Sequence, residues 1–164
     1  MSLQPGNVAV RLAVPADVRD LESIVRASYL PYVPRIGRAP APVTADYAAA
    51  IARGEVWLAS VRQGSGDETP APAGAVGLIV LVGKPGYLLL ENVAVLPSMQ
   101  GFGIGTGLLA FAEAHARELG LPEIRLYTNA AMTENLAYYQ RRGYVETHRA
   151  MADGFSRVYF SKPL

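Results

Sequence analysis

The chain of 164 residues contains no cysteine and only two histidines, His115 and His148. Without cysteine there can be no disulfide framework, no thiolate-ligated zinc or iron–sulfur site and no cysteine nucleophile. Two isolated histidines also argue against a histidine-rich metal site. We therefore expect no metal cofactor.

An excess of charge and long apolar runs are also missing. Fifteen basic and fourteen acidic residues leave a net charge of +1, which gives no long-range field for nucleic acid. The apolar run 74–82 is far shorter than the roughly 20 residues of a membrane helix. Residues 1–10 lack the basic and apolar regions of a secretory signal. These absences predict a cytoplasmic protein without nucleic-acid or membrane partners.

The composition that remains, 51% hydrophobic and 18% charged, is typical of a compact protein. A chain of this length has enough residues for one core, so we expect a single domain over residues 1–164. Periodicity and turn signals predict an α/β (α+β) fold, with a mixed, mostly antiparallel central sheet of about seven strands flanked by four helices. The expected strands are 8–13, 55–62, 75–82, 87–95, 124–128, 144–150 and 155–160; the expected helices are 15–29, 44–53, 103–119 and 133–142.

Three details accompany this expectation. Thr44 is the expected N-cap of helix 44–53, and residues 63–73 read as a polar connector. In helix 103–119 the apolar stripe is expected to include Ile104, Leu108, Phe111, Ala112 and Leu119.

Segment 90–106 carries the most information. Four glycines, Gly101, Gly103, Gly105 and Gly107, lie between a predicted strand and a predicted helix. Glycine permits close backbone approach, and a helix N-terminus offers free N–H groups and a positive dipole end. Together they can form a cradle for phosphate oxygens. The alternative is a glycine turn that only begins a packed helix.

The spacing of these glycines excludes the commonest phosphate motifs. A dinucleotide fingerprint needs glycine at the sixth position, where Thr106 or Leu108 stands instead. The segment has no lysine for a Walker loop and no serine in a nucleophile elbow.

The run Gln100–Gly105 does fit a Q-x-x-G-x-G signature, and it follows the apolar run 93–97. About 30 residues later, segment 135–144 (NLAYYQRRGY) resembles an N…Y-x-x-x-G-[FY] block. Both blocks, in this order, resemble the GNAT superfamily of N-acetyltransferases over nearly the whole chain. One departure is Met132, where family members often have asparagine; Asn135, four residues before Tyr139, can still share its helix face.

The resemblance implies acetyl-CoA as cosubstrate, a primary amine of a small molecule or peptide as acceptor, and a homodimer as one expected assembly. The residues it implies for acetyl-CoA are Val93, Ala94, Val95, Gln100, Gly101, Phe102, Gly103, Ile104, Gly105, Thr106 and Asn135.

Since no cysteine can carry the acyl group, the amine would attack the thioester directly. The resemblance implies Tyr139 as the acid that protonates the leaving thiolate and the backbone N–H of Val95 as donor to the oxyanion. A core role is the alternative for Tyr139. Glu91, four residues before Val95, is expected on the same strand face, partly desolvated, as the base. If it faces solvent, bulk water takes the proton.

Loop residues Tyr29, Tyr32, Arg35 and Arg38 are the candidates for acceptor binding, because arginine forks suit a carboxylate or phosphate. The alternative is a solvated loop whose arginines bind nothing. With Asp46 the only acidic residue in 29–47, strongly cationic acceptors are disfavoured. Other details stay open. Asn129 either contacts the acceptor or caps a turn, His115 is expected in packing and His148 at the surface. A CoA-binding sensor without turnover is the alternative function.

Overall fold

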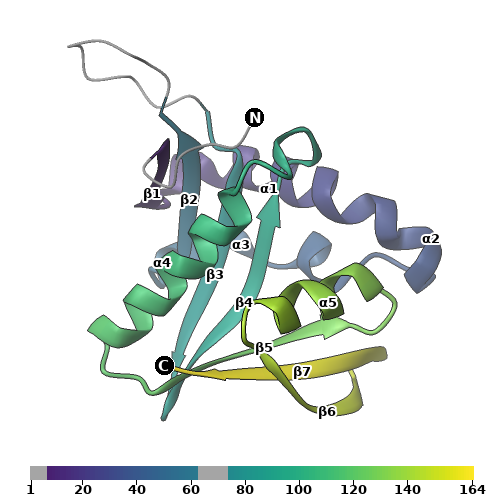
Figure 1. Ribbon diagram of the computed structural model, residues 1–164. Helices are drawn as coiled ribbons and strands as arrows, with labels where there is room; N and C mark the ends of the chain where they lie inside the picture. Colours follow the sequence, from purple (N-terminus) through teal and green to yellow (C-terminus); the bar gives the residue numbers. More distant parts are fainter. Residues whose placement is uncertain (1–6, 63–73) are drawn as a thin grey trace.

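Residues 7–62 and 74–164 are described by the computed structural model (Figure 1). Their strands form one seven-stranded sheet in the order β1-β2-β3-β4-β5-β7-β6. Neighbouring strands are antiparallel except β4 and β5, which run parallel. The expected mixed, mostly antiparallel sheet is therefore confirmed. The strands are β1 (Val8–Leu12), β2 (Val56–Val61), β3 (Gly77–Lys84), β4 (Tyr87–Val95), β5 (Glu123–Asn129), β6 (Val145–Ala152) and β7 (Phe155–Pro163).

The helices lie on both faces of this sheet (Figure 1). In the described part of the chain, four are longer than one turn: α1 (Val18–Tyr29), α3 (Tyr47–Ala52), α4 (Ile104–Glu118) and α5 (Thr133–Arg141). The single turn α2 (Val33–Ile36) follows α1, and short 3-10 turns include η3 (Leu30–Tyr32) and η4 (Ala41–Thr44). Each long helix buries one apolar face against the sheet, which is what positions α4 and α5 beside the ends of β4 and β5.

Two hydrophobic clusters, one on each face of the sheet, make up the core. On one face Leu21 and Ile24 of α1 pack with Leu78 of β3. On the other face Leu108 of α4 packs with the cluster that contains Phe160 of β7. Burying apolar side chains on both faces is the main stabilising contribution to such a layered fold.

Strand β4 contains a bulge at Glu91. Val80 pairs with Asn92 and Leu81 pairs with Leu90, so Glu91 is the extra residue without a partner in β3. A bulge reverses which residues face each side of the strand. In a regular strand Leu90 and Ala94, four residues apart, would face the same side of the sheet. Here Leu90 packs in the cluster that contains Leu108 of α4, whereas Ala94 packs in the cluster that contains Leu21 of α1.

Beyond this bulge, β4 and β5 separate. Their parallel pairing covers only Leu88–Leu90 and Ile124–Leu126. The remaining ends of the two strands diverge beside α5 (Figure 1). The candidate site lies at this divergence.

Most expected elements are confirmed with ends that differ by three residues at most. Thr44 as N-cap is wrong: Ala45 is extended, and Asp46 caps α3 by accepting from the Ala49 N–H at 3.0 Å. The prediction that Leu119 belongs to the apolar stripe of this helix is also wrong, because Leu119 follows the end of α4 and is 51% exposed. The predicted connector 63–73 lies outside the described residues.

Candidate active site

A large cavity of about 670 Å³ opens at the N-terminus of α4. The chain enters this helix through Gly101 and Gly103, whose φ angles of +82° and +88° are left-handed and favour glycine. The first turn of α4 therefore presents its free N–H groups to the cavity. All eleven residues that the resemblance implied for acetyl-CoA line this outer cavity, from Val93 on β4 through Thr106 on α4 to Asn135 on α5.

Arg142 lies beside this helix N-terminus, and the sequence reasoning missed it. Its guanidinium lies 3.5 Å from the centre of the Tyr138 ring, and its Nη2 donates to Thr106 Oγ1 at 3.0 Å. Its Nε atom is buried without a partner in the described chain. The signal in the sequence was the pair of arginines directly before Gly143 in the second motif. Arg142 adds a fixed positive charge to the positive end of α4.

Gly105 lets α5 approach α4 closely. A Cβ atom at this position would lie 2.8 Å from the Tyr138 hydroxyl oxygen. Tyr138 thus points its hydroxyl at the first turn of α4, and burial raises its pKa.

Tyr139, by contrast, points into the core on the other side of α5. Only 6% of it is exposed, and its ring packs edge-on against Tyr144 with 5.7 Å between centroids. Burial raises its pKa well above the ordinary value. Tyr139 belongs to the core cluster, as its alternative role requires, and it also lines the outer cavity. Its role as acid stays a prediction.

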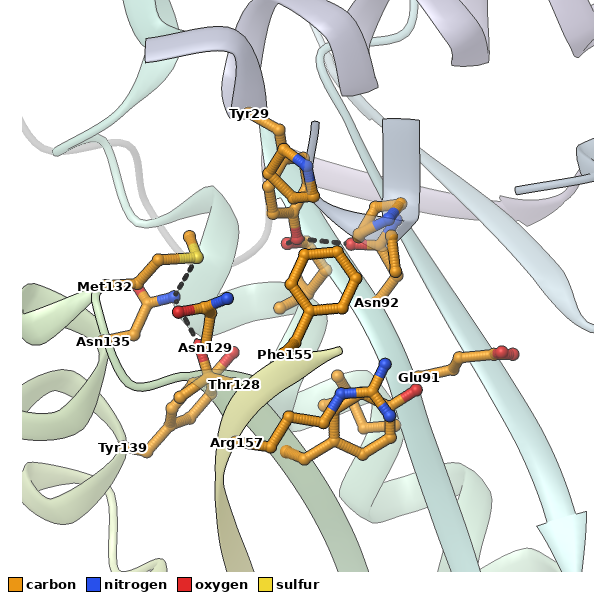
Figure 2. A pocket seen from close by; sticks show the side chains of 16 residues that line it. Tyr29, Glu91, Asn92, Thr128, Asn129, Met132, Asn135, Tyr139, Phe155 and Arg157 are labelled. Carbon is orange, nitrogen blue, oxygen red and sulfur yellow. Dashed lines mark hydrogen bonds between the residues drawn. The ribbon is translucent and has the colours of Figure 1, made fainter. Parts of the chain in front are cut away.

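A second, inner pocket of about 70 Å³ lies in the divergence of β4 and β5 (Figure 2). Its walls come from β4, β5, α5 and β7, and residues 40–42 cover one side. Asn135 donates from Nδ2 to Thr128 Oγ1 at 3.1 Å, which fixes an amide at the boundary of this pocket. Five of the described residues line both the inner pocket and the outer cavity: Tyr29, Val93, Met132, Asn135 and Tyr139. The two cavities therefore adjoin at these five residues, which include Tyr139.

Tyr29 reaches this junction, but its hydroxyl is already bound. It lies 2.5 Å from Asn92 Oδ1 and 3.1 Å from the Val93 carbonyl oxygen. Asn92 in turn donates to the Tyr47 hydroxyl at 3.1 Å, and Tyr47 donates to the Pro42 carbonyl at 2.6 Å. This buried network fastens β4 to α1, α3 and the segment that covers the pocket, and burial raises the pKa of Tyr29 and Tyr47.

Glu91 is placed differently from the expectation. The bulge separates it from Val95, so the expectation that both share a strand face is wrong. Its side chain is exposed rather than partly desolvated, and Figure 2 shows it pointing away from the centre of the inner pocket. Glu91 nevertheless lines the edge of that pocket.

The loop arginines contact the protein itself. Arg35 forms an ion pair of 2.8 Å with Glu134 of α5, and its guanidinium lies 5.3 Å from the Tyr32 ring centre. Arg38 lies 3.7 Å from the centre of the Phe155 ring and donates to the Asp153 carbonyl. Their contacts hold segment 30–44 across the site, to α5 on one side and to the β6–β7 turn on the other.

The smaller expectations have clear outcomes. Asn129 caps a turn by accepting from the Ala131 N–H at 2.9 Å, and it also lines the inner pocket. His115 packs against Trp57 and Phe111, and His148 is at the surface, both as expected.

No helix of the described residues combines the length and apolar character needed to cross a membrane. Residues 7–62 and 74–164 contain no group of three or more His, Asp or Glu side chains suited to a metal ion.

Arg157 of β7 is the second residue that the sequence reasoning missed. Its guanidinium is buried in the wall of the inner pocket, 4.3 Å from the centre of the Tyr127 ring. No sequence pattern marks it, because an arginine in a terminal hairpin usually faces solvent.

Comparison with known proteins agrees with this geometry. The profile of the Acetyltransferase (GNAT) family matches residues 21–144. Mycothiol acetyltransferase of Cellulomonas flavigena is 32% identical over 161 residues, which cover 87% of this chain and 42% of that protein. Aminoalkylphosphonate N-acetyltransferase of Salmonella typhimurium is 39% identical over 59 residues, covering 36% of this chain and 38% of that protein. The chain thus spans less than half the length of these curated relatives.

Solved structures share the fold at lower identity. A GCN5-related N-acetyltransferase from Rhodopseudomonas palustris superposes with a TM-score of 0.74 at 23% identity, covering 100% of this chain and 99% of that one. PaiA N-acetyltransferase from Thermoplasma acidophilum, solved with coenzyme A, superposes with a TM-score of 0.72 at 18% identity, covering 96% and 99%. With the profile match over most of its length, the chain belongs to the GNAT acetyltransferase family.

Proposed function

We propose that this chain transfers an acetyl group from acetyl-CoA to the primary amine of a small acceptor by direct attack in a ternary complex. The observation that carries the proposal is the meeting of two cavities at Tyr139, one large enough for a cofactor and one sized for a small group. Two relatives are named for the acetylation of small molecules, mycothiol and aminoalkylphosphonates. The narrow inner pocket favours a small acceptor over a peptide.

The outer cavity has the chemistry that a CoA pyrophosphate needs. The glycine turn and the first turn of α4 offer N–H donors, and Arg142 places a cation with an unpartnered buried Nε beside them. Donors of this kind bind phosphate oxygens at helix N-termini. Acetyl-CoA would supply the acetyl group as a reactive thioester.

Strand β4 supplies backbone donors at the junction. The Leu96 N–H bonds to the Val76 carbonyl on the β3 side. Peptide groups alternate along a strand, so those of Val93 and Val95 face the opposite, β5 side. Their carbonyls accept from Tyr29 and Ser28 there, which supports this orientation. Because pairing with β5 ends at Leu90, the N–H of Val95 is a suitable donor to a developing oxyanion.

Tyr139 is the proposed acid. Its raised pKa keeps the phenol protonated at neutral pH, and it lines both cavities, where the leaving sulfur would lie. A protonated phenol can donate to a thiolate as the carbon–sulfur bond breaks.

Glu91 is the proposed route for the proton that the amine loses. An alkyl amine has a pKa of roughly 10 and must be neutral to attack. Among the described residues that line the inner pocket, Glu91 is the only carboxylate. Its exposed position at the edge favours transfer through water rather than direct contact. Bulk water is the alternative acceptor of the proton.

Release of free CoA thiol from acetyl-CoA in the presence of a panel of primary amines tests the proposal. We expect release that depends on the amine and a mass increase of one acetyl group in the product. Tight CoA binding without thiol release on any amine would instead support the non-catalytic sensor. The single domain, the cytoplasmic location and the homodimer stay predictions.

A further inference from the structure

We propose that the inner pocket binds the anionic group of the acceptor, and that Arg157 is the residue that recognises it. The acceptor would be a small primary amine that also carries an oxyanion, either a carboxylate or a phosphonate. This inference rests on the proposed acetyl transfer and names the class of molecule that is acetylated.

Arg157 is buried in the wall of the inner pocket. Only 9% of the residue is exposed, and its guanidinium lies 4.3 Å from the Tyr127 ring centre and 5.9 Å from that of Phe155. An arginine stays charged under all ordinary conditions. A buried charge is costly unless an opposite charge and hydrogen bonds compensate it, so an anion in the inner pocket would stabilise the guanidinium.

The protein supplies only a weak partner. Asp153 Oδ2 lies 3.3 Å from Arg157 Nη1, but 80% of the Asp153 side chain is exposed, and this pair is not aligned as a hydrogen bond. An exposed carboxylate is well screened by water and salt. Glu91, the carboxylate of the pocket, forms no ion pair with Arg157 and points away from it (Figure 2). Within the described chain the guanidinium therefore has unused donors that face the inner pocket.

A second hydrogen-bond donor lies directly opposite Arg157 in the sheet. Asn129 of β5 is its cross-strand partner, so both side chains leave the same face of the sheet as neighbours. Asn129 uses its oxygen to accept from the Ala131 N–H, which leaves its amide NH₂ for another partner. Both residues line the inner pocket. A guanidinium and an amide side by side form a set of donors suited to an oxyanion.

This donor pair lies in the inner pocket and outside the outer cavity. Arg157 and Asn129 line only the inner pocket, whereas Tyr139 lines both the inner pocket and the outer cavity. A molecule whose anion binds Arg157 would direct its other end towards Tyr139 and the ends of β4. The pocket of about 70 Å³ allows only a short spacer between the anion and the amine. Short amino acids and aminoalkylphosphonates have this form.

Steady-state thiol release with a matched acceptor series tests the inference. The series is 3-aminopropanoate, 2-aminoethylphosphonate and the neutral isostere 3-aminopropanamide. We expect kcat/KM for the better anion to exceed that for the amide by about 30-fold or more, and the ratio of the two anions to identify the preferred oxyanion. Arg157→Gln should lower kcat/KM for the anions by a similar factor, mainly through KM, and remove the preference. The kcat/KM of Arg157→Lys for the anions should lie between those of the wild type and Arg157→Gln, because lysine keeps the charge but cannot donate two parallel hydrogen bonds.

Arg125→Gln is the matched control. Arg125 of β5 also lies over a tyrosine, 4.1 Å from the centre of the Tyr87 ring, and pairs with a carboxylate, Glu123, but it is outside both cavities. Its replacement should leave the preference for anions unchanged. An equal loss in Arg125→Gln and Arg157→Gln would overturn the assignment of the site to Arg157.

Binding of methylphosphonate and acetate in the presence of CoA, followed by NMR titration, separates the two proposals. Binding to the wild type that is lost in Arg157→Gln, without turnover of any amine, would refute the acetyl transfer and retain the anion site. Turnover with equal kcat/KM for anionic and neutral amines would refute the anion site and retain the transfer. Should Arg157→Gln fail to fold, the wild-type ratio and Arg157→Lys decide between these outcomes.

Discussion

The rings of Tyr138 and Tyr139, neighbours on α5, lie 5.4 Å apart at 84° to one another. Tyr138 points its hydroxyl at Gly105 and the α4 N-terminus, while Tyr139 packs with Tyr144 and Phe160 and reaches the junction of the two cavities. Adjacent helical residues are about 100° apart around the axis. Tyr138 therefore packs α5 on α4, whereas Tyr139 lies at the boundary between the core and the two cavities.

The first prediction concerns the Tyr139 hydroxyl. Tyr139→Phe keeps the ring and its packing but removes the proton donor, so kcat should fall by about 100-fold or more with little change in the Kd of CoA. Stopped-flow or steady-state thiol release together with calorimetric CoA titration would measure both quantities.

Tyr144→Phe is its control. Tyr144 packs against the Tyr139 ring, and its own hydroxyl is buried without a partner in the described chain. Its removal should leave kcat unchanged and leave stability equal or slightly higher. If both variants lose activity equally, packing of the aromatic cluster explains the loss and Tyr139 has no role as acid.

The second prediction separates the strain of the glycine turn from its role in binding. Gly103→Ala and Gly86→Ala both force alanine into a left-handed conformation, with φ of +88° and +84° and open space around each new Cβ. Each should lose about 1 kcal/mol of unfolding free energy. Only Gly103→Ala should also weaken CoA binding, by about 10-fold, because Gly86 lies in the β3–β4 turn. Chemical denaturation and CoA titration of both variants give the comparison, and equal CoA affinity in the two would contradict the cradle.

The third prediction assigns Arg142 to the phosphates. Arg142→Gln should weaken CoA binding by about 10-fold and reduce its dependence on salt, while pantetheine, which lacks the nucleotide phosphates, should bind as before. Arg149→Gln on β6 removes an exposed arginine that pairs with Glu146 and is the control. A loss of pantetheine affinity equal to the loss for CoA would show that Arg142 shapes the cavity without contacting phosphate.

Local sequence signals predicted the fold and the outer cavity well for a physical reason. The glycines from Gly101 to Gly107 lie between an apolar strand and an amphipathic helix, and turn chemistry and periodicity are both properties of neighbouring residues. The residues that the family resemblance implied for acetyl-CoA all line one cavity, because most of them belong to this one continuous segment.

The inner pocket depends on contacts that local patterns do not encode. The bulge at Glu91 depends on the register of β4 against β3, and it overturned the face expected for that carboxylate. Arg157 enters the site only because β7 pairs with β5 and places it opposite Asn129. From the sequence, the guanidinium groups of Arg35 and Arg38 were candidates for binding the acceptor. In the structure they contact Glu134 and Phe155, which lie about 100 residues further along the chain.

The last prediction concerns stability and pH at a site far from the chemistry. Asp17, before α1, accepts two hydrogen bonds of 2.8 Å from Arg11 and one of 2.7 Å from the Val14 N–H. Its side chain is 11% exposed, and these bonds lower its pKa to about 2. A carboxyl whose pKa is lower when folded stabilises the protein above its unfolded pKa of about 3.9, and this contribution disappears as the pH falls towards 2.

Asp17→Asn should therefore lose about 2 kcal/mol of unfolding free energy at pH 7, and the difference from the wild type should shrink to about half by pH 3. Urea unfolding at pH 7, 4 and 3 measures this directly. Asp20→Asn, at an exposed position one turn later, should change stability by less than about 0.5 kcal/mol at any of these pH values. A difference between Asp17→Asn and the wild type that stays constant from pH 7 to pH 3 would mean that packing and the cap, rather than the ion pair with Arg11, hold this corner of the fold.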